Sequence, residues 1–238
     1  MSAASVVSSR VASKVGGWSL IVATALFAAV FTYLAGAFGY PDVLDRPAAE
    51  VLPQLLSLGW QGRVVWVVYG LVPFLLIPTA IGVSAVARDI APRTTQLALA
   101  TAILSALTMS LGLLRWPSLQ WHLALAFADG TPAARESITA IFDAANSYLG
   151  NFIGEGLGEL FLNAFFAAST FALLRTNPAR RWLAYAGFIA VTFGIVALFR
   201  NIAPVVAPIA AINNVVLPIW MVTLGAVMVR QPLNSLIR

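Results

Sequence analysis

Long apolar runs separated by short polar connections dominate the 238-residue chain. A transmembrane α-helix needs about 20 apolar residues to cross the ~30 Å hydrocarbon core of a bilayer, and six runs come close to or exceed that length. The pattern therefore predicts an all-α, polytopic transmembrane helical bundle in which residues 1–238 form a single integral membrane domain. The six spans are expected at approximately residues 17–38, 62–87, 95–115, 150–174, 182–199 and 209–229.

Three segments between these runs predict short helices outside the hydrocarbon core. Pro47–Leu58 and Pro117–Phe127 are moderately apolar but too short to span, which favours interfacial or re-entrant helices. Pro132–Ser147 is typical of an amphipathic helix that begins in water and continues into the fourth span. The Arg115–Pro117 sequence is expected to stop the third span, with the arginine reaching to the interface. Tryptophans expected to anchor the outer interface are Trp60, Trp116 and Trp121.

The composition agrees with a membrane protein. Hydrophobic residues make up 60% of the chain and charged residues 10%, and the mean hydropathy is +0.88. Because an average soluble domain carries about 25% charged residues, too little polar surface is present to coat a soluble globule. The pI is about 10.2, but the basic residues form no stripe beside aromatic residues, so no nucleic-acid partner is expected. The bilayer itself is the expected partner.

The distribution of basic residues predicts the orientation of the chain. Two short connections and the two tails hold nine of the fourteen basic residues, and the opposite connections hold most of the acids. By the positive-inside rule the first set is cytoplasmic. An even number of spans then places the N- and C-termini in the cytoplasm. The nine residues are Arg10, Lys14, Arg88, Arg93, Arg175, Arg180, Arg181, Arg230 and Arg238.

The fourth expected span carries two rows of residues that do not suit lipid. Polar residues recur at a spacing of four, which keeps neighbours on nearly one helix face, and beside them runs a row of glycines that lets another helix approach closely. Both rows are therefore expected to face protein. The polar row is Asp143, Ser147, Asn151, Glu155, Glu159 and Asn163, and the glycine row is Gly150, Gly154 and Gly158.

Counting about 1.5 Å per residue from the cytoplasmic ends places the charged residues at two depths. Glu155 falls near the outer edge of the core, level with Arg115 and Arg200, which predicts an ion pair between Glu155 and one of these arginines. Glu159 falls deeper, with no arginine at its level, so its carboxyl group is expected to be protonated at neutral pH. Other polar residues assigned to the same region are Asn151, Tyr33, Asn213 and Asn214.

Two interpretations of these polar residues stay open. Under the structural one, a Glu–Arg pair and asparagine hydrogen bonds hold helices together, each contributing roughly 1 kcal/mol. Under the functional one, the residues form a pocket that opens to the extracytoplasmic side and binds or translocates a proton or a small solute. For the protein as a whole, the alternative function is a non-catalytic accessory subunit or interaction protein that packs through the glycine row against a membrane-protein partner or a second copy of itself.

No catalytic or metal-binding motif is present. The chain has no cysteine and a single histidine, His122, and it lacks the HExxH, GxSxG and phosphate-binding glycine-loop patterns. We therefore assign no catalytic residue, no cofactor and no metal, and an enzyme is not expected.

Three stretches of the chain resemble bacterial polytopic membrane protein families known only as domains of unknown function. The resemblance implies a bacterial cytoplasmic (inner) membrane and six or seven helices, and it implies no activity and no catalytic residues. The stretches are GYPDVLDRPAAEVLP at 39–53, YGLVPFLLIPTAIG at 69–82 and YLGNFIGEGLGELF at 148–161.

The predicted orientation can be tested with a reporter enzyme that is active only outside the cytoplasm. Fused after Pro132 the reporter should be active, and fused after Pro178 or at Arg238 it should be inactive, because the arginine-rich connections are retained inside. Activity of the C-terminal fusion would require an odd number of spans and would overturn the topology.

Overall fold

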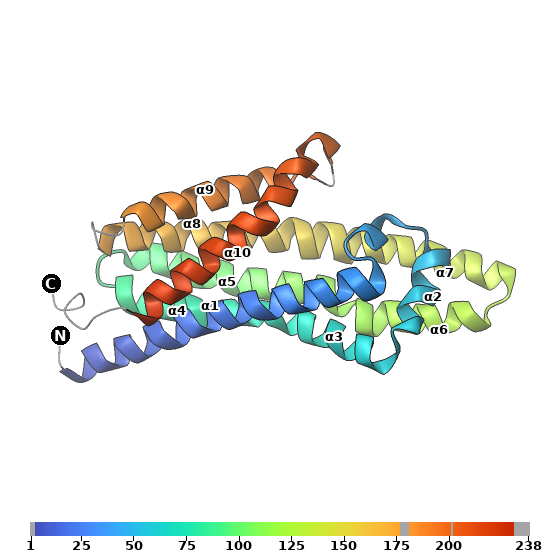
Figure 1. Ribbon diagram of the computed structural model, residues 1–238, viewed down its shortest axis with the longest axis horizontal. Helices are drawn as coiled ribbons and strands as arrows, with labels where there is room; N and C mark the ends of the chain where they lie inside the picture. The colour runs from blue at the N-terminus through green and yellow to red at the C-terminus, as the bar shows by residue number, and fades with distance from the viewer. Residues whose placement is uncertain (1–2, 177–180, 201, 231–238) are drawn as a thin grey trace. The chain divides into compact units, whose positions relative to one another are not determined.

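The computed structural model describes residues 3–176, 181–200 and 202–230. Within these residues every regular element is a helix and no strand occurs, which confirms the all-α class (Figure 1). Pro178, Arg180 and Arg238, which enter the predicted topology, lie outside the described residues.

The helical segments match the six predicted apolar runs in number and order. Among the described residues, five helical segments are long and apolar enough to cross a membrane, and a sixth, Arg181–Ala197, is apolar but has 17 residues. The five are Val7–Phe38, Gly59–Ala87, Pro92–Asp129, Pro132–Thr176 and Ala207–Val229.

The elements follow one another as helices joined by turns. In order they are α1 (Ala3–Phe38), η1 (Asp42–Asp45), α2 (Ala48–Ser57), α3 (Gly59–Leu71), η2 (Val72–Leu75), α4 (Leu76–Ala87), α5 (Pro92–Leu114), η3 (Trp116–Gln120), α6 (Trp121–Asp129), α7 (Pro132–Ala145), η4 (Asn146–Leu157), α8 (Gly158–Thr176), α9 (Arg181–Ala197), η6 (Pro204–Val206) and α10 (Ala207–Val229).

The chain divides into two compact units, each built from several separate segments. Unit 1 comprises Met1–Thr24, Phe74–Leu107 and Gly158–Arg238, and unit 2 comprises Ala25–Pro73 and Thr108–Leu157. The boundaries fall inside helical segments, so the chain passes between the units four times without leaving helical structure. That the whole chain acts as one membrane domain stays a prediction.

Unit 1 is held together by helices that touch through bare backbone. α8 packs beside α9, α9 beside α10, and α4 against α8. The first part of α1 meets other helices at glycines: a Cβ on Gly17 would lie 2.6 Å from the Gly225 carbonyl oxygen, and one on Gly16 would lie 3.0 Å from the Gly82 Cα. Such approaches leave no room for a side chain and bring large areas of helix into van der Waals contact.

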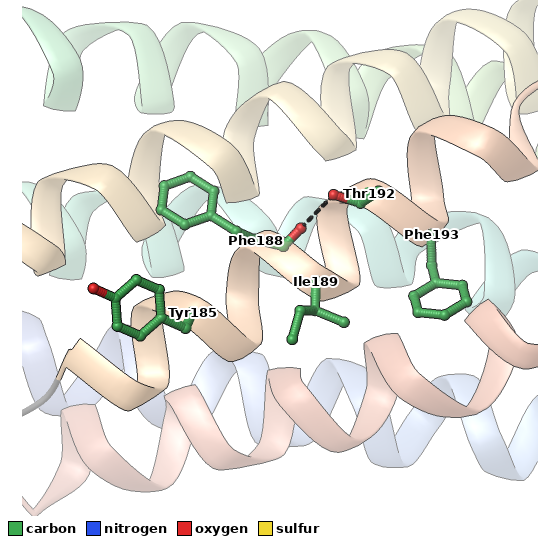
Figure 2. A pocket seen from close by; sticks show the side chains of 5 residues that line it. All are labelled: Tyr185, Phe188, Ile189, Thr192 and Phe193. Atoms are coloured by element: carbon green, nitrogen blue, oxygen red, sulfur yellow. Dashed lines mark hydrogen bonds between the residues drawn. The ribbon is translucent and has the colours of Figure 1, made fainter.

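One face of α9 forms a shallow apolar groove of about 380 Å³ (Figure 2). The Thr192 hydroxyl in this groove donates a hydrogen bond of 2.8 Å to the Phe188 carbonyl of the same helix. The groove is lined by Tyr185, Phe188, Ile189, Thr192 and Phe193.

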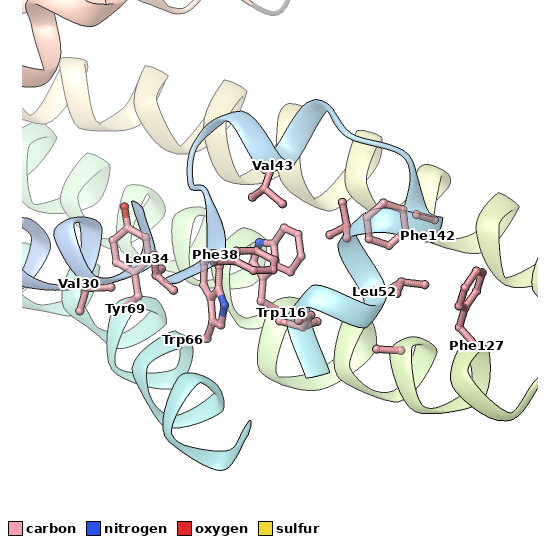
Figure 3. Close-up of a cluster of buried hydrophobic side chains, with 14 residues drawn as sticks. Val30, Leu34, Phe38, Val43, Leu52, Trp66, Tyr69, Trp116, Phe127 and Phe142 are labelled. Atoms are coloured by element: carbon pink, nitrogen blue, oxygen red, sulfur yellow. The ribbon is translucent and has the colours of Figure 1, made fainter. Parts of the chain in front are cut away.

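Aromatic rings fill the core of unit 2. Trp66 of α3 and Trp116 of η3 are stacked, with ring centroids 5.0 Å apart and planes 18° apart. Phe38, near the end of α1, meets both rings edge-on, at 5.9 and 5.4 Å (Figure 3). All three side chains are fully or almost fully buried. α2 packs against α6 and buries Leu52 and Leu55 in the same cluster.

Two predictions around Pro117 are wrong. Trp116 is 1% exposed and belongs to the core, so it is no interfacial anchor. The helix also does not stop at Pro117, because η3 is a π-helical turn in which the Gln120 N–H donates to the Arg115 carbonyl, five residues earlier, at 2.8 Å. The wider turn accommodates a proline ring that would otherwise collide with the preceding turn. Residues 117–127 therefore continue the α5 helix into α6.

The other short helices agree with the sequence. Residues 48–57 form α2, which has ten residues and is too short to span. α7 begins at Pro132, where the Thr131 hydroxyl accepts a hydrogen bond of 3.3 Å from the Ala134 N–H, and it runs through η4 into α8. Gly39 and Gly59 adopt φ values of 70° and 64°, which allow the chain to turn after α1 and after α2.

The glycine contacts of α1 make a stability prediction with an internal control. Gly17→Ala should destabilise the protein by about 1–3 kcal/mol, because its new Cβ meets a backbone carbonyl that cannot move cheaply. Gly36→Ala, in the same helix with nothing within 4 Å of the new Cβ, should be neutral or stabilise by up to about 1 kcal/mol through helix propensity. Thermal unfolding in detergent measures both. Equal melting temperatures would contradict the close approach.

Candidate functional site

A bidentate ion pair joins two helices of unit 1. Arg200 Nη1 and Nη2 donate to Glu159 Oε2 and Oε1, each at 2.8 Å, and the two side chains are 26% and 23% exposed. Two parallel charge-assisted hydrogen bonds make this the strong geometry for an arginine–carboxylate pair. Glu159 lies in the first turn of α8, and Arg200 follows the last turn of α9.

The pair lies at one end of the α8–α9 pair of helices. These helices pack side by side and are consecutive in the chain through residues 177–180. Glu159 precedes Thr176, the last residue of α8, by 17 positions, which corresponds to about 26 Å along a helix axis. If the connection lies at one membrane interface, the ion pair therefore lies near the opposite interface of a ~30 Å core.

This pairing corrects one expectation from the sequence, in which the depths counted along the helices left Glu159 without an arginine. The count used Cα positions and ignored the direction of the side chains, which in a helix lean toward its N-terminus. Arg200 Nη1 also donates to the Ala197 carbonyl, three residues earlier, at 3.3 Å, so the guanidinium turns back along α9. Both oxygens of the Glu159 carboxyl group accept hydrogen bonds from Arg200, so the expectation that Glu159 has no neighbouring arginine, on which its predicted protonation rested, is wrong.

Two asparagine side chains of unit 1 are buried, and one of them lies beside the ion pair. One turn after Glu159, the Asn163 Nδ2 donates to the Glu159 carbonyl at 2.8 Å, and its Oδ1 packs against the bare backbone of Gly194 in α9. Asn163 and Asn213 are 5% and 9% exposed, and among the described residues neither Oδ1 accepts a hydrogen bond. A buried acceptor without a donor costs about 1–3 kcal/mol. Unit 1 therefore combines an ion pair with two acceptors that would gain from a donor.

A second charged group is buried in unit 2. Arg115 is 6% exposed, and its guanidinium lies 5.0 Å from the centre of the Trp116 ring. Arg115 Nη2 donates to Asn146 Oδ1 at 2.9 Å, and Asn146 Nδ2 donates in turn to the Leu44 carbonyl at 3.2 Å. Asn146 thus links Arg115 to the turn after α1. Because Arg115 is buried, the sequence prediction that it reaches to the membrane interface is wrong.

Arg115 also satisfies the backbone next to Pro117. Its Nη1 donates to the carbonyl of Gly112, five residues before Pro117, whose nitrogen carries no hydrogen to donate. Glu155 interacts electrostatically with the same guanidinium. The charge of Arg115, one of the two arginines proposed for Glu155, therefore acts on Glu155 within unit 2.

The glycine row lies inside the protein. A Cβ on Gly150 would lie 2.5 Å from Arg115 Nη2, and one on Gly154 would lie 2.9 Å from the Gly112 Cα. The Gly158 carbonyl accepts a hydrogen bond of 2.9 Å from Ser105 Oγ in unit 1. Gly150 and Gly154 thus make room for the arginine and for the α5 backbone within unit 2.

The remaining predicted residues have no described role in either group. Asn151 and Asn214 are exposed on η4 and α10, and Tyr33 is 40% exposed on α1. In the part of the chain that the structure describes, no three His, Cys, Asp or Glu residues are arranged to hold a metal ion. The polar contacts thus form one group in each unit: Glu159, Arg200 and Asn163 in unit 1, and Arg115, Asn146 and Glu155 in unit 2.

Asn146 and Gln120 were not singled out from the sequence. Asn146 stands four residues before Gly150, so extending the glycine row back by one step finds it. Gln120 is completely buried, four residues after Trp116, and within the described residues neither atom of its amide has a partner. Its burial follows from the π-helical turn at Trp116–Gln120, which the sequence pattern does not predict.

The ion pair makes a prediction that separates pairing from charge. Removing one partner, as in Glu159→Gln or Arg200→Gln, should cost about 1–3 kcal/mol, between the values for exposed and buried pairs. The double variant should cost less than the sum, because both single variants already break the same contact. Thermal unfolding of the four proteins measures the coupling, and additive losses would show that the pair contributes nothing.

Comparison with known proteins identifies a family for this architecture. A family model described as a domain of unknown function, DUF4386, matches residues 15–225, which include every residue of both polar groups. No curated protein matches the chain, and no solved structure matches it. Because the match covers most of the chain, the protein belongs to the DUF4386 family of domains of unknown function.

Proposed function

We propose that this protein is a multi-pass protein of a bacterial inner membrane that binds a small zwitterionic solute at Glu159 and Arg200, from the extracytoplasmic side. The observation that carries the proposal is the bidentate ion pair, about one-quarter exposed, at the end of two apolar helices. The excess of basic residues in the connection between α8 and α9 supports a cytoplasmic connection, and hence an outward-facing pair.

The stability of the fold does not by itself explain an ion pair at this position. Replacing a buried ion pair by apolar residues of similar volume is often neutral or stabilising, so apolar contacts would serve α8 and α9 at least as well. The Asn163 acceptor, one turn from Glu159, adds to this, because a buried amide oxygen without a donor is unfavourable in a scaffold. A donor group of a bound solute would relieve that cost.

Charge balance favours a zwitterion over a solute with a single charge. A solute carboxylate can take the place of Glu159 on the guanidinium while a solute ammonium group takes the place of Arg200 on the carboxylate. A solute with one charge would bind only one of the two side chains and would separate the other from the partner it has in this ion pair, which is unfavourable. A proton is a weaker candidate, since both oxygens of the Glu159 carboxyl group already accept hydrogen bonds from Arg200.

A docking function through the glycine row has less support. Gly150 and Gly154 are buried by residues of their own chain, at Arg115 and Gly112. A partner helix would first have to displace these contacts. The row therefore does not offer a free surface to another subunit.

The proposal is tested by measuring how the wild type and each variant respond to three different probes. Thermal unfolding of the purified full chain is measured with glycine, sodium acetate or methylammonium chloride at equal ionic strength. Glycine should stabilise the wild type more than either singly charged probe, by about 2.7 kcal/mol at a concentration 100 times Kd. Glu159→Gln should respond to acetate instead, because acetate can supply the carboxylate that Arg200 binds in the wild type, and Arg200→Gln should respond to methylammonium.

The double variant Glu159→Gln/Arg200→Gln serves as the matched control, because it keeps the shape and the net charge of the wild type. It should respond to none of the three probes. Equal responses of all four proteins, or no response of the wild type to glycine, would leave the ion pair as a purely structural contact and would reject the proposed function.

A further inference from the structure

We infer that α9 carries a binding site for one anionic phospholipid, with an acyl chain in the groove of Tyr185–Phe193 and the phosphate at Arg175 and Arg181. This site is independent of the solute proposed for Glu159 and Arg200. Three features support it: the apolar groove on α9, the basic residues at the start of that helix, and the distance along the helix between the two.

The groove offers only apolar contact. Its five lining residues all belong to one face of α9, with Tyr185 and Ile189 60% and 56% exposed (Figure 2). The Thr192 hydroxyl is satisfied within the helix. An occupant of the groove is therefore recognised by shape and hydrophobic contact, as an acyl chain is.

The end of the groove nearest to the start of α9 carries unbalanced positive charge. Arg175 lies in the last turn of α8 with its guanidinium 4.6 Å from the Phe171 ring centre, and Arg181 begins α9. Both are exposed, and neither forms an ion pair with any described residue. No Asp or Glu follows Glu159 in the chain. Juxtamembrane basic residues attract anionic lipid by about 1 kcal/mol each.

The spacing of charge and groove matches one leaflet of a bilayer. Tyr185 and Phe193 stand four and twelve positions after Arg181, or about 6 and 18 Å along the helix. One leaflet of a ~30 Å core is about 15 Å deep. With Arg181 at the headgroups, the groove therefore runs through the acyl region of the same leaflet. Trp182, 56% exposed, stands at the boundary, where tryptophan is enriched.

Native mass spectrometry of the full chain tests the site. The protein is released from detergent after incubation with equal amounts of dioleoyl phosphatidylglycerol and dioleoyl phosphatidylcholine, and the lipids that stay bound are counted. One phosphatidylglycerol should be retained. Arg175→Gln/Arg181→Gln should lower its affinity by roughly 30-fold, the factor expected for two contacts of about 1 kcal/mol. Ile189→Trp, which fills the groove, should lower the retention of either lipid.

Each variant has a matched control. Arg88→Gln/Arg93→Gln removes the same charge from another basic connection, and Ile195→Trp places the same bulk on α9 outside the groove; both should bind as the wild type does. Equal losses in both arginine variants would mean general electrostatic attraction. Equal retention of the two lipids, or a dimer in place of the bound lipid, would also reject the site.

Discussion

A polar group inside a bilayer has no water to bind, and the contacts of this protein follow from that constraint. Hydroxyl groups between helices donate to backbone carbonyls: Ser13 to Met228 and Thr79 to Gly16, each at 3.1 Å. Arg115 distributes its donors over an amide, a carbonyl and an aromatic ring. Glycines then decide which helices come close enough for such bonds, because a Cβ at those positions would collide with the facing backbone.

The two arginines show how the same side chain serves different surroundings. Arg115 is enclosed by the aromatic rings of unit 2 and binds an asparagine, so its charge is spread over neutral groups and an acid nearby. Arg200 is partly exposed and binds a carboxylate directly through both ends of its fork. A neutral network holds a fixed geometry, whereas a direct ion pair offers two opposite charges that other charged groups can replace.

The sequence predicted the helices well, because length and hydropathy are local properties. The six apolar runs, the short helix after Pro47 and the amphipathic start at Pro132 all correspond to observed elements. The site was predicted less well, because depth along a straight α-helix does not describe where a side chain ends. The Arg200 side chain turns back along α9 and donates to the Ala197 carbonyl, and the helix continues through Pro117 by a π-helical turn. Neither feature follows from residue spacing.

The shortness of α9 has a further consequence for where this protein is stable. Its 17 residues extend about 26 Å, less than an average hydrocarbon core, while the neighbouring segments are longer. Such hydrophobic mismatch is relieved by local thinning of the bilayer or by flanking residues that reach to the interface. Thin membranes with short acyl chains therefore fit α9 best. In a thicker membrane the mismatch would fall at the ends of α9, one of which is followed by Arg200 and its contact with Glu159.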